Sequence, residues 1–334
     1  HQWHIAIFSI IFIRTNMAGR TMSSDKLNIV GASIGPPGSP RTYSGVPFHL
    51  FGLLSQRDHL IATIDSYRIK PQDVLTGLVS FRRSIKRRRP KKHPLWRFRP
   101  KSIKALSKRM GKHLEALPFH DSLLQIGVGG MPDKSVKLFA HAEISVKEAI
   151  NNPIYGPAYD LERTGASLEK EVCHGERIFL ERCDLIWTNS ETTARTFSHH
   201  NIPRSKFFIY PPGVSPDHHR YFTRKWDQIH ILFVGTQWTS KGGGLLAEAF
   251  EKIRKHRSDA QLTIVGCNPI LKMRNVTIYP YLNKSHPIDL KTFNNCLKNA
   301  TVFCMPSFWE STGLVYMEAA LSGLPVVMLK GQGR

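Results

Sequence analysis

The stretch HILFVGTQWTSKGGGLLAEAF at residues 230–250 decides the fold class. It opens with an apolar run, residues 230–234, that stops at Gly235, a pattern typical of a buried strand. The segment 243–256 then repeats apolar side chains at helical spacing and is predicted to be an amphipathic helix. A strand, a glycine-containing loop and a helix in this order form the repeating unit of an α/β fold with a parallel sheet.

The same alternation continues toward the end of the chain. The sequence predicts strands at 261–265, 276–279, 301–305 and 325–329, with helices at 290–299 and 312–322 between them. Because the last strand is not followed by a helix that would cover it, we expect this domain, residues 215–334, to be incomplete.

An earlier alternating series precedes this domain. The apolar residues 27–31 lead into the loop GASIGPPGSPRTYSG and then into a helical pattern from Val46. The loop lacks the GxGxxG spacing of a dinucleotide-binding site. The sequence predicts further strands at 60–64, 123–128, 136–140 and 207–210, and a helix followed by a strand within 177–187. The proline-rich segment 211–216 then separates a domain at 26–214 from the second one, and we expect the two doubly wound domains to face each other across a cleft.

Composition narrows the class of protein. The formal net charge of +22 favours polyanionic partners such as an anionic membrane face, a nucleic acid or a diphosphate-bearing substrate. The five cysteines form no CxxC pair, which argues against a zinc site or a disulfide framework and fits a reducing, cytoplasmic compartment. The longest apolar run, residues 4–13, is shorter than the ~20 residues of a membrane helix. Since the first methionine is Met17, we expect residues 1–25 to be a non-native or disordered extension.

A basic segment at residues 82–112 carries fifteen lysines and arginines. One hypothesis is a patch that binds an anionic membrane surface, with Trp96 and Phe98 inserted at the interface. The plainer hypothesis is a mobile, solvated insertion between two strands. A nucleic-acid interface ranks third, because the segment matches no known module and holds few aromatic residues.

The stretch ESTGLVYME contains the most informative acidic pair, Glu310 and Glu318. Between them, Ser311, Thr312 and Gly313 lie at the start of the predicted helix, where free N–H groups and the helix dipole form an anion site. Two carboxylates around such a site suit a ligand with a diphosphate between two sets of hydroxyls, as in a nucleotide sugar. A helix with an acidic first turn is the structural alternative.

A cation completes the pattern. Lys241 stands directly before the glycines that open the helix at 243–256, from where it can neutralise a diphosphate leaving group. A solvated lysine on a turn is the alternative for this residue. A third segment, LTIVG at 262–266, is a strand that ends in glycine.

Taken in order, the strand–KG–helix segment, LTIVG and the E-x7-E spacing closely resemble the C-terminal domain of glycosyltransferase family 4, a group of retaining enzymes with the GT-B fold. The resemblance is strong over residues 207–327. It implies an α/β architecture of two facing Rossmann-like doubly wound domains, of which the second binds the nucleotide sugar. It also implies that neither a metal nor a cofactor is required.

The resemblance assigns expected roles position by position. Glu310 matches the glutamate near the transferred sugar, Glu318 matches the one that binds the ribose hydroxyls, and Lys241 matches the lysine on the donor diphosphate. The family often has an arginine where this chain has Thr236, so the diphosphate has one cation fewer than the pattern expects.

The first domain resembles the family less closely. The segment TYSGVPFHLFGLL is similar to the glycine loop and helix that close over the donor, which makes Ser44 and Gly45 candidates for diphosphate binding. The segment LFAHAEIS places His141 where the family often has an active-site histidine, although a histidine at a strand end is more often structural.

The resemblance implies a metal-independent, retaining glycosyltransferase of the hexosyl type. Lys241 and the amides of residues 311–313 would stabilise the leaving diphosphate, while Glu310 and His141 position or polarise the sugar. We expect a saccharide or lipid-linked acceptor and a cytoplasmic protein that is peripheral to the membrane. The alternative is a catalytically weak or inactive scaffold that binds an anionic membrane or a nucleic acid through its basic segment, which the threonine at 236 favours.

Overall fold

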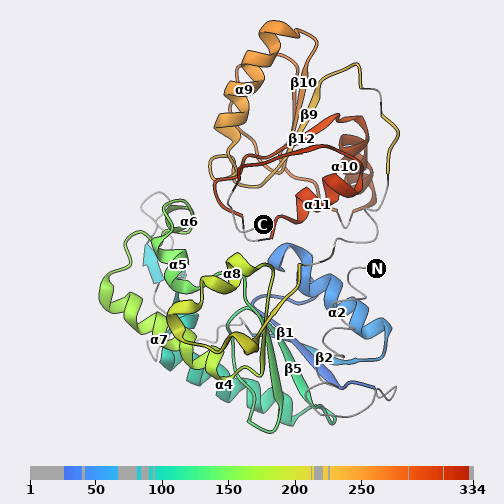
Figure 1. Ribbon diagram of the computed structural model, residues 1–334. Coiled ribbons are helices and arrows are strands. Elements are labelled where there is room, and N and C mark those ends of the chain that lie inside the picture. The colour runs from blue at the N-terminus through green and yellow to red at the C-terminus, as the bar shows by residue number, and fades with distance from the viewer. Residues whose placement is uncertain are drawn as a thin grey trace. The chain divides into compact units, whose positions relative to one another are not determined.

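The computed structural model describes residues 26–39, 42–66, 81–83, 90–92, 95–211, 213, 221–224, 226–284, 286–310 and 312–330. The chain divides into two compact units, His1–Pro212 and Gly213–Arg334, each built around its own parallel sheet (Figure 1). The boundary falls inside the proline-rich segment 211–216. The expected extension at residues 1–25 lies outside the described residues.

The first unit contains a six-stranded parallel sheet in the order β2-β1-β5-β6-β7-β8. Its strands are β1 (Ile29–Ser33), β2 (Leu60–Asp65), β5 (Ser122–Ile126), β6 (Lys137–His141), β7 (Leu185–Thr188) and β8 (Phe207–Ile209). A separate antiparallel pair is formed by β3 (Phe81–Arg83) and β4 (Pro90–Lys92). β1 and β5 are buried along their whole length, as expected of parallel strands that are covered by helices on both faces.

Helices connect the strands of this sheet. They are α2 (Val46–Gln56), α4 (Pro100–Glu115), α5 (Val146–Asn151), α6 (Tyr155–Ala158), α7 (Ala166–Arg182) and α8 (Glu191–Arg195). Short 3₁₀ turns are η1 (Thr42–Gly45), η2 (Trp96–Phe98), η3 (Ser198–His200) and η4 (Arg204–Lys206). α4 and α7 pack against each other (Figure 1).

The basic segment is part of this packing, so two expectations are wrong for its residues 95–112: the insertion of Trp96 and Phe98 at a membrane interface, and the solvated insertion between strands. Trp96 and Phe98 are 2% and 7% exposed and belong to the core, so neither can insert into a membrane interface. α4 is a covering helix that buries Ile103, Leu106 and Met110, and therefore is not a solvated insertion.

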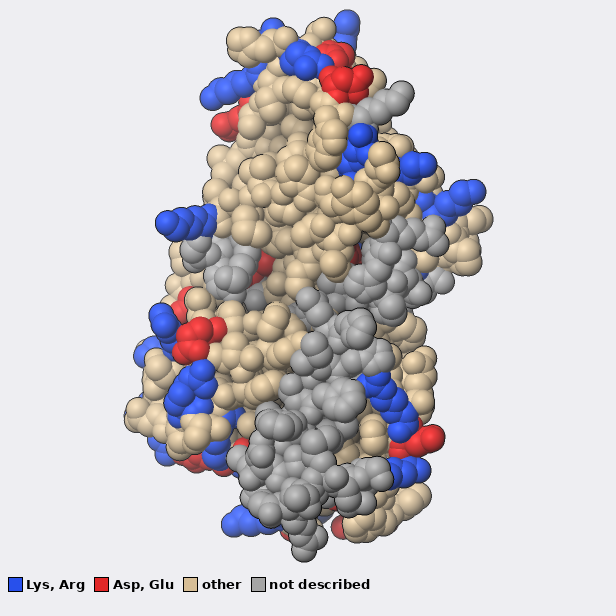
Figure 2. All heavy atoms as spheres, turned by 45° about the vertical axis from the view of Figure 1, so that its right-hand side comes forward, with Lys and Arg blue, Asp and Glu red and all other residues tan. Residues whose placement is uncertain are grey.

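The lysines of α4 occupy its outer face. Exposed lysines recur along the helix at Lys101, Lys104, Lys108 and Lys112. On the face drawn in Figure 2, the described Lys and Arg side chains lie in separate small groups, several of them beside Asp or Glu. This face therefore has no continuous basic patch among the described residues.

The second unit contains a five-stranded parallel sheet in the order β11-β10-β9-β12-β13. Its strands are β9 (His230–Val234), β10 (Gln261–Val265), β11 (Val276–Tyr279), β12 (Val302–Cys304) and β13 (Val326–Val327), and its helices are α9 (Gly243–His256), α10 (Pro287–Asn299) and α11 (Leu314–Leu321). The core includes the fully buried aromatic residues Phe233, Phe250, Phe293 and Phe303. No helix among the described residues of either unit has the length and apolar character needed to cross a membrane.

Each sheet reverses its strand order at one point. In the second unit the chain runs outward from β9 through β10 to β11 and then returns to add β12 on the other side of β9. The loops after β9 and β12 therefore leave neighbouring strands at the same edge of the sheet. In open α/β sheets this is the position where ligands bind.

Candidate functional site

The reversal point of the second unit brings Lys241 and Glu310 into direct contact. Lys241 follows β9 and Glu310 follows β12, and Lys241 Nζ donates to Glu310 Oε2 at 2.6 Å and to the Trp309 carbonyl oxygen at 3.4 Å. The two side chains are 20% and 13% exposed, so the pair is shielded but reachable by solvent. The cation and the first carboxylate of the predicted site are thus adjacent, although the sequence did not predict an ion pair.

The backbone conformation of Gly242 determines where Lys241 lies. Gly242 has φ +74°, and a Cβ at this residue would overlap the carbonyl oxygen of Pro306. The Phe308 amide donates to the Ser240 carbonyl at 3.0 Å, which ties the β12 loop to the β9 loop. The short approach of the two backbones, which only glycine permits at this residue, is what brings Lys241 to Glu310.

The N-terminus of α11 lies directly after this pair. Its N-cap is Gly313, with φ +65° and no side-chain cap hydrogen bond, and a Cβ there would lie 3.2 Å from Glu310 Cγ. The Tyr316 hydroxyl donates to the Met305 carbonyl at 2.7 Å and anchors the helix to the end of β12. Thr312 is half-buried in the same turn, whereas Ser311 lies outside the described residues. The helix end thus lies directly against the Glu310 side chain.

The second carboxylate, Glu318, has a cationic partner that the sequence did not reveal. Glu318 is 6% exposed, and Lys284 Nζ lies 2.7 Å from both of its carboxylate oxygens. The same ammonium lies 4.2 Å from the centroid of the Phe293 ring, a cation–π contact that fixes it further. Lys284 belongs to the connection between β11 and α10, and no sequence spacing relates it to α11. Each glutamate of the E-x7-E motif is therefore neutralised by one lysine.

His141, the histidine predicted in the first unit, ends β6 and is buried at 1% exposure. Its Nε2 lies 2.9 Å from Asn189 Oδ1, and its ring packs at 4.5 Å against Trp187. Since the amide oxygen of Asn189 only accepts, Nε2 carries the hydrogen and Nδ1 carries a lone pair. That lone pair is buried and has no hydrogen-bond partner among the described residues.

Burial lowers the pKa of His141 from 6.5 to about 4, against a weaker opposing effect of its hydrogen bond to Asn189. The unfolded chain therefore binds a proton here between those two values while the folded protein does not, so stability falls as pH drops below 6.5. The free energy of unfolding changes by about 1 kcal/mol per pH unit in this range.

We predict that the free energy of unfolding of His141→Gln, which cannot titrate at this residue, falls by about 1 kcal/mol less than that of the wild type when the pH is lowered from 6 to 5. Urea unfolding at both pH values measures this, with the exposed His113→Gln as control. Equal losses for all three proteins would refute it.

The loop candidates of the first unit lie after β1. Gly45 has φ +86° and caps α2 without a side-chain hydrogen bond, and Ser44 belongs to η1, although its side chain is outside the described part. Gly127, which sequence reasoning missed, has φ +79°, and a Cβ there would overlap the hydroxyl of Tyr43. Because β1 and β5 are adjacent, these loops share the reversal point of their own sheet.

Comparison with known structures identifies the fold. The chain superimposes on WaaG, a glycosyltransferase involved in lipopolysaccharide biosynthesis, with a TM-score of 0.58 and 16% identity over 91% of this chain and 82% of that one. Sucrose-phosphate synthase from Thermosynechococcus elongatus superimposes with a TM-score of 0.59 and 12% identity, over 92% of this chain and 82% of that one. HepE from Anabaena, solved with UDP, superimposes with a TM-score of 0.55 and 13% identity, also over 92% of this chain and 82% of that one. The predicted GT-B fold, with two parallel-sheet α/β domains, is confirmed.

Comparison with sequence families shows which family the second unit resembles. Residues 228–334 match the family described as Glycosyl transferases group 1, so this part of the chain is similar to that family. D-inositol 3-phosphate glycosyltransferase of Paenarthrobacter aurescens (strain TC1) is 28% identical over 151 residues, which cover 39% of this chain and 36% of that protein. An uncharacterized glycosyltransferase of Methanocaldococcus jannaschii is 28% identical over 167 residues, which cover 44% of this chain and 42% of that protein. The chain thus spans less than half the length of these curated relatives.

Proposed function

We propose that this protein is a glycosyltransferase that moves a sugar from a nucleotide-sugar donor to an acceptor with retention of anomeric configuration and without a metal ion. The contact between Lys241 and Glu310 beside the N-terminus of α11 carries the proposal. It combines one cation, one carboxylate and a set of helix amides at the edge of the sheet where α/β proteins bind ligands.

The proposed chemistry follows from these groups. Without donor, Lys241 is held by Glu310; with donor, its ammonium would turn to the diphosphate, which carries more negative charge than one carboxylate. The lysine and the first amides of α11 would then stabilise the charge that develops on the leaving nucleoside diphosphate. Glu310, released from the lysine, would bind a hydroxyl of the transferred sugar, and the acceptor would attack from the face that the diphosphate leaves.

The remaining motif residues would bind the donor elsewhere. Glu318 would accept hydrogen bonds from the ribose hydroxyls, and Lys284 would keep that carboxylate from repelling the diphosphate. The buried Nδ1 of His141 would accept a hydrogen bond from the sugar once the side chain becomes accessible, and Ser44 and Gly45 would approach the diphosphate from their loop. The solved complex of HepE with UDP and glucose supports a nucleotide sugar as donor and a saccharide as partner.

The experiment is a donor screen. The purified protein is incubated with UDP-, GDP- and ADP-sugars, with EDTA present, and release of the nucleoside diphosphate is measured with and without saccharide and lipid-linked acceptors. One donor class should be turned over, and Glu310→Gln should lower the rate by about 10²-fold or more. Glu251→Gln, an exposed glutamate on α9, is the matched control. Turnover of no donor, or equal rates for both variants, would overturn the proposal.

A scaffold that binds an anionic membrane is the second candidate, favoured by the exposed lysines along α4. The exposed Thr236, in place of the family's arginine, also favours it. In this case the protein would sediment with vesicles that contain phosphatidylserine and show no donor turnover. Active enzyme that also binds the vesicles would instead support a peripheral glycosyltransferase.

A further inference from the structure

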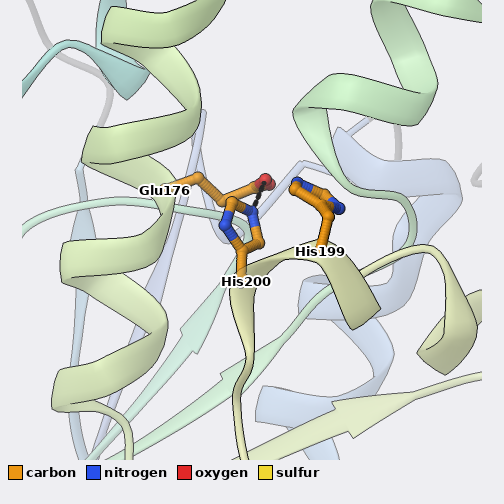
Figure 3. A group of neighbouring side chains, drawn as sticks. All are labelled: Glu176, His199 and His200. Atoms are coloured by element: carbon orange, nitrogen blue, oxygen red, sulfur yellow. Dashed lines mark hydrogen bonds and ion pairs between the residues drawn. The ribbon is translucent and has the colours of Figure 1, made fainter.

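A cluster of three potential metal ligands lies in the first unit. Glu176 comes from α7, and His199 and His200 come from η3. One ligand atom of each side chain lies within 4.8 Å of the other two. Figure 3 shows the carboxylate of Glu176 between the two imidazole rings. None of these residues belongs to the donor site proposed above.

The carboxylate is buried and held in a fixed orientation. Glu176 is 1% exposed, and both of its oxygens accept from the Val146 amide at 3.0 Å, at the N-terminus of α5. His200, 4% exposed, places its Nε2 2.7 Å from Glu176 Oε2. A carboxylate taken out of water requires compensation by a cation or by further hydrogen bonds.

One ring nitrogen of His199 lies buried without a partner among the described residues, which the ion pair of Glu176 with His200 does not explain. Its Nδ1 lies 3.0 Å from the Thr196 carbonyl oxygen, which can only accept, so Nδ1 carries the hydrogen and Nε2 a lone pair. That Nε2 is buried and has no hydrogen-bond partner among the described residues. Metal-binding histidines are oriented in the same manner, with the second ring nitrogen donating to a carbonyl.

We propose that Glu176, His199 and His200 bind a zinc ion that ties η3 to α7. Two imidazole nitrogens and one carboxylate oxygen are ligands that Zn²⁺ accepts, and a water molecule would complete a tetrahedral site. With metal–ligand bonds of about 2.1 Å, neighbouring ligand atoms of such a site lie roughly 3.4 Å apart. Zinc binding would release the proton of the 2.7 Å Glu176–His200 hydrogen bond to solvent, so that both atoms bind the ion in place of that hydrogen bond. The ligands that are now up to 4.8 Å apart would close around the ion.

The surroundings decide how strong the site can be. Arg97 acts on Glu176 and Lys147 acts on His199 as nearby positive charges, and both oppose a divalent cation. Burial raises the pKa of the nearby Cys173 thiol to about 11, so this group is protonated and contributes no thiolate. His199 is only half-buried and is the most solvent-accessible of the three residues. The function of the ion would be to brace α7 against the segment that follows α8.

The test is metal binding by the purified, EDTA-treated protein. Titration calorimetry with ZnCl₂ should show one tight equivalent, and excess Zn²⁺ should raise the thermal unfolding midpoint by about 5 °C. His199→Gln should weaken this binding at least ten-fold, while the exposed His113→Gln, a matched control for weak surface binding, should not. Equal affinity in all three proteins would overturn the proposal, because Glu176 and His200 would then form only a buried pair.

A second readout does not depend on the variant's folding. Co²⁺ added to the wild type should produce the intense visible absorption of a tetrahedral complex, and one equivalent of Zn²⁺ should remove it. A spectrum of weak, octahedral Co²⁺ would contradict the site. Both measurements report metal binding and are unaffected by failure of the donor screen.

Discussion

Replacement of Lys241 by methionine is expected to lower the rate of sugar transfer by about 10²- to 10³-fold, the loss typical when one group that stabilises developing charge is removed. Methionine keeps an apolar chain as long as the apolar part of the lysine side chain and removes the charged end group. The chain has Thr236 where the family often carries a second cation, so no arginine at that position can replace the lost ammonium. The effect should appear in the rate at saturating donor, measured as release of nucleoside diphosphate.

The control for this prediction is Lys252→Met on the exposed face of α9, which makes the same chemical change in the same helical region. This variant should retain the wild-type rate. Loss of Lys241 also frees Glu310, so donor binding is expected to weaken as the carboxylate faces the diphosphate unpaired. A Lys241→Met protein with the wild-type rate would show that this lysine serves only to neutralise Glu310.

The second unit could be predicted closely because its local signals agree with each other. The strands predicted at 230–234, 261–265 and 276–279 match the structure residue for residue, as does the helix at 243–256. Each segment pairs a clear hydrophobic period with a glycine, a proline or a charged turn at its end. Order along the chain then placed Lys241 and the E-x7-E motif at one sheet edge, since the carboxyl ends of parallel strands share that edge.

What the sequence concealed depends on segments that meet only in the folded chain. Lys284 contacts Glu318 across 34 positions, and Asn189 contacts His141 across 48. No spacing rule relates residues so far apart on different elements. The cluster of Glu176 with His199 and His200 was missed for the same reason. Glu176 lies more than twenty residues before the two histidines, so no metal-ligand spacing in the sequence relates the three residues.

The basic segment was misjudged for a different reason. Its many charges suggested exposure, yet the apolar residues Ile103, Leu106 and Met110 recur at helical spacing and cover the sheet. Lysine side chains can lie along the outer face of such a helix while its inner face is part of the core. The period of the few apolar residues was therefore a better guide to this segment than its charge.

Gly242→Ala is expected to destabilise the second unit by on the order of 3 kcal/mol or more. The backbone at this residue has φ +74°, a left-handed conformation that costs roughly 1–2 kcal/mol for a residue with a Cβ. In addition, the new methyl group would overlap the Pro306 carbonyl oxygen, a backbone atom that cannot move aside by changing rotamer. The loops after β9 and β12 would have to separate, which would also move Lys241 away from Glu310. Urea unfolding and the donor assay measure the two effects together.

Gly244→Ala two residues later provides the matched comparison, because the same side chain is added to the same helix terminus. Gly244 is exposed and lies within α9, and no heavy atom lies within 4 Å of the position that a Cβ would occupy there. Alanine at a helical position is favoured over glycine by up to about 1 kcal/mol, so this variant should be as stable as the wild type or slightly more stable. If both variants unfold at the same urea concentration, the close approach of the two loops is not what fixes the site. If only Gly242→Ala is destabilised and inactive, the glycine after the lysine is required by backbone contact, and the position of the cation depends on it.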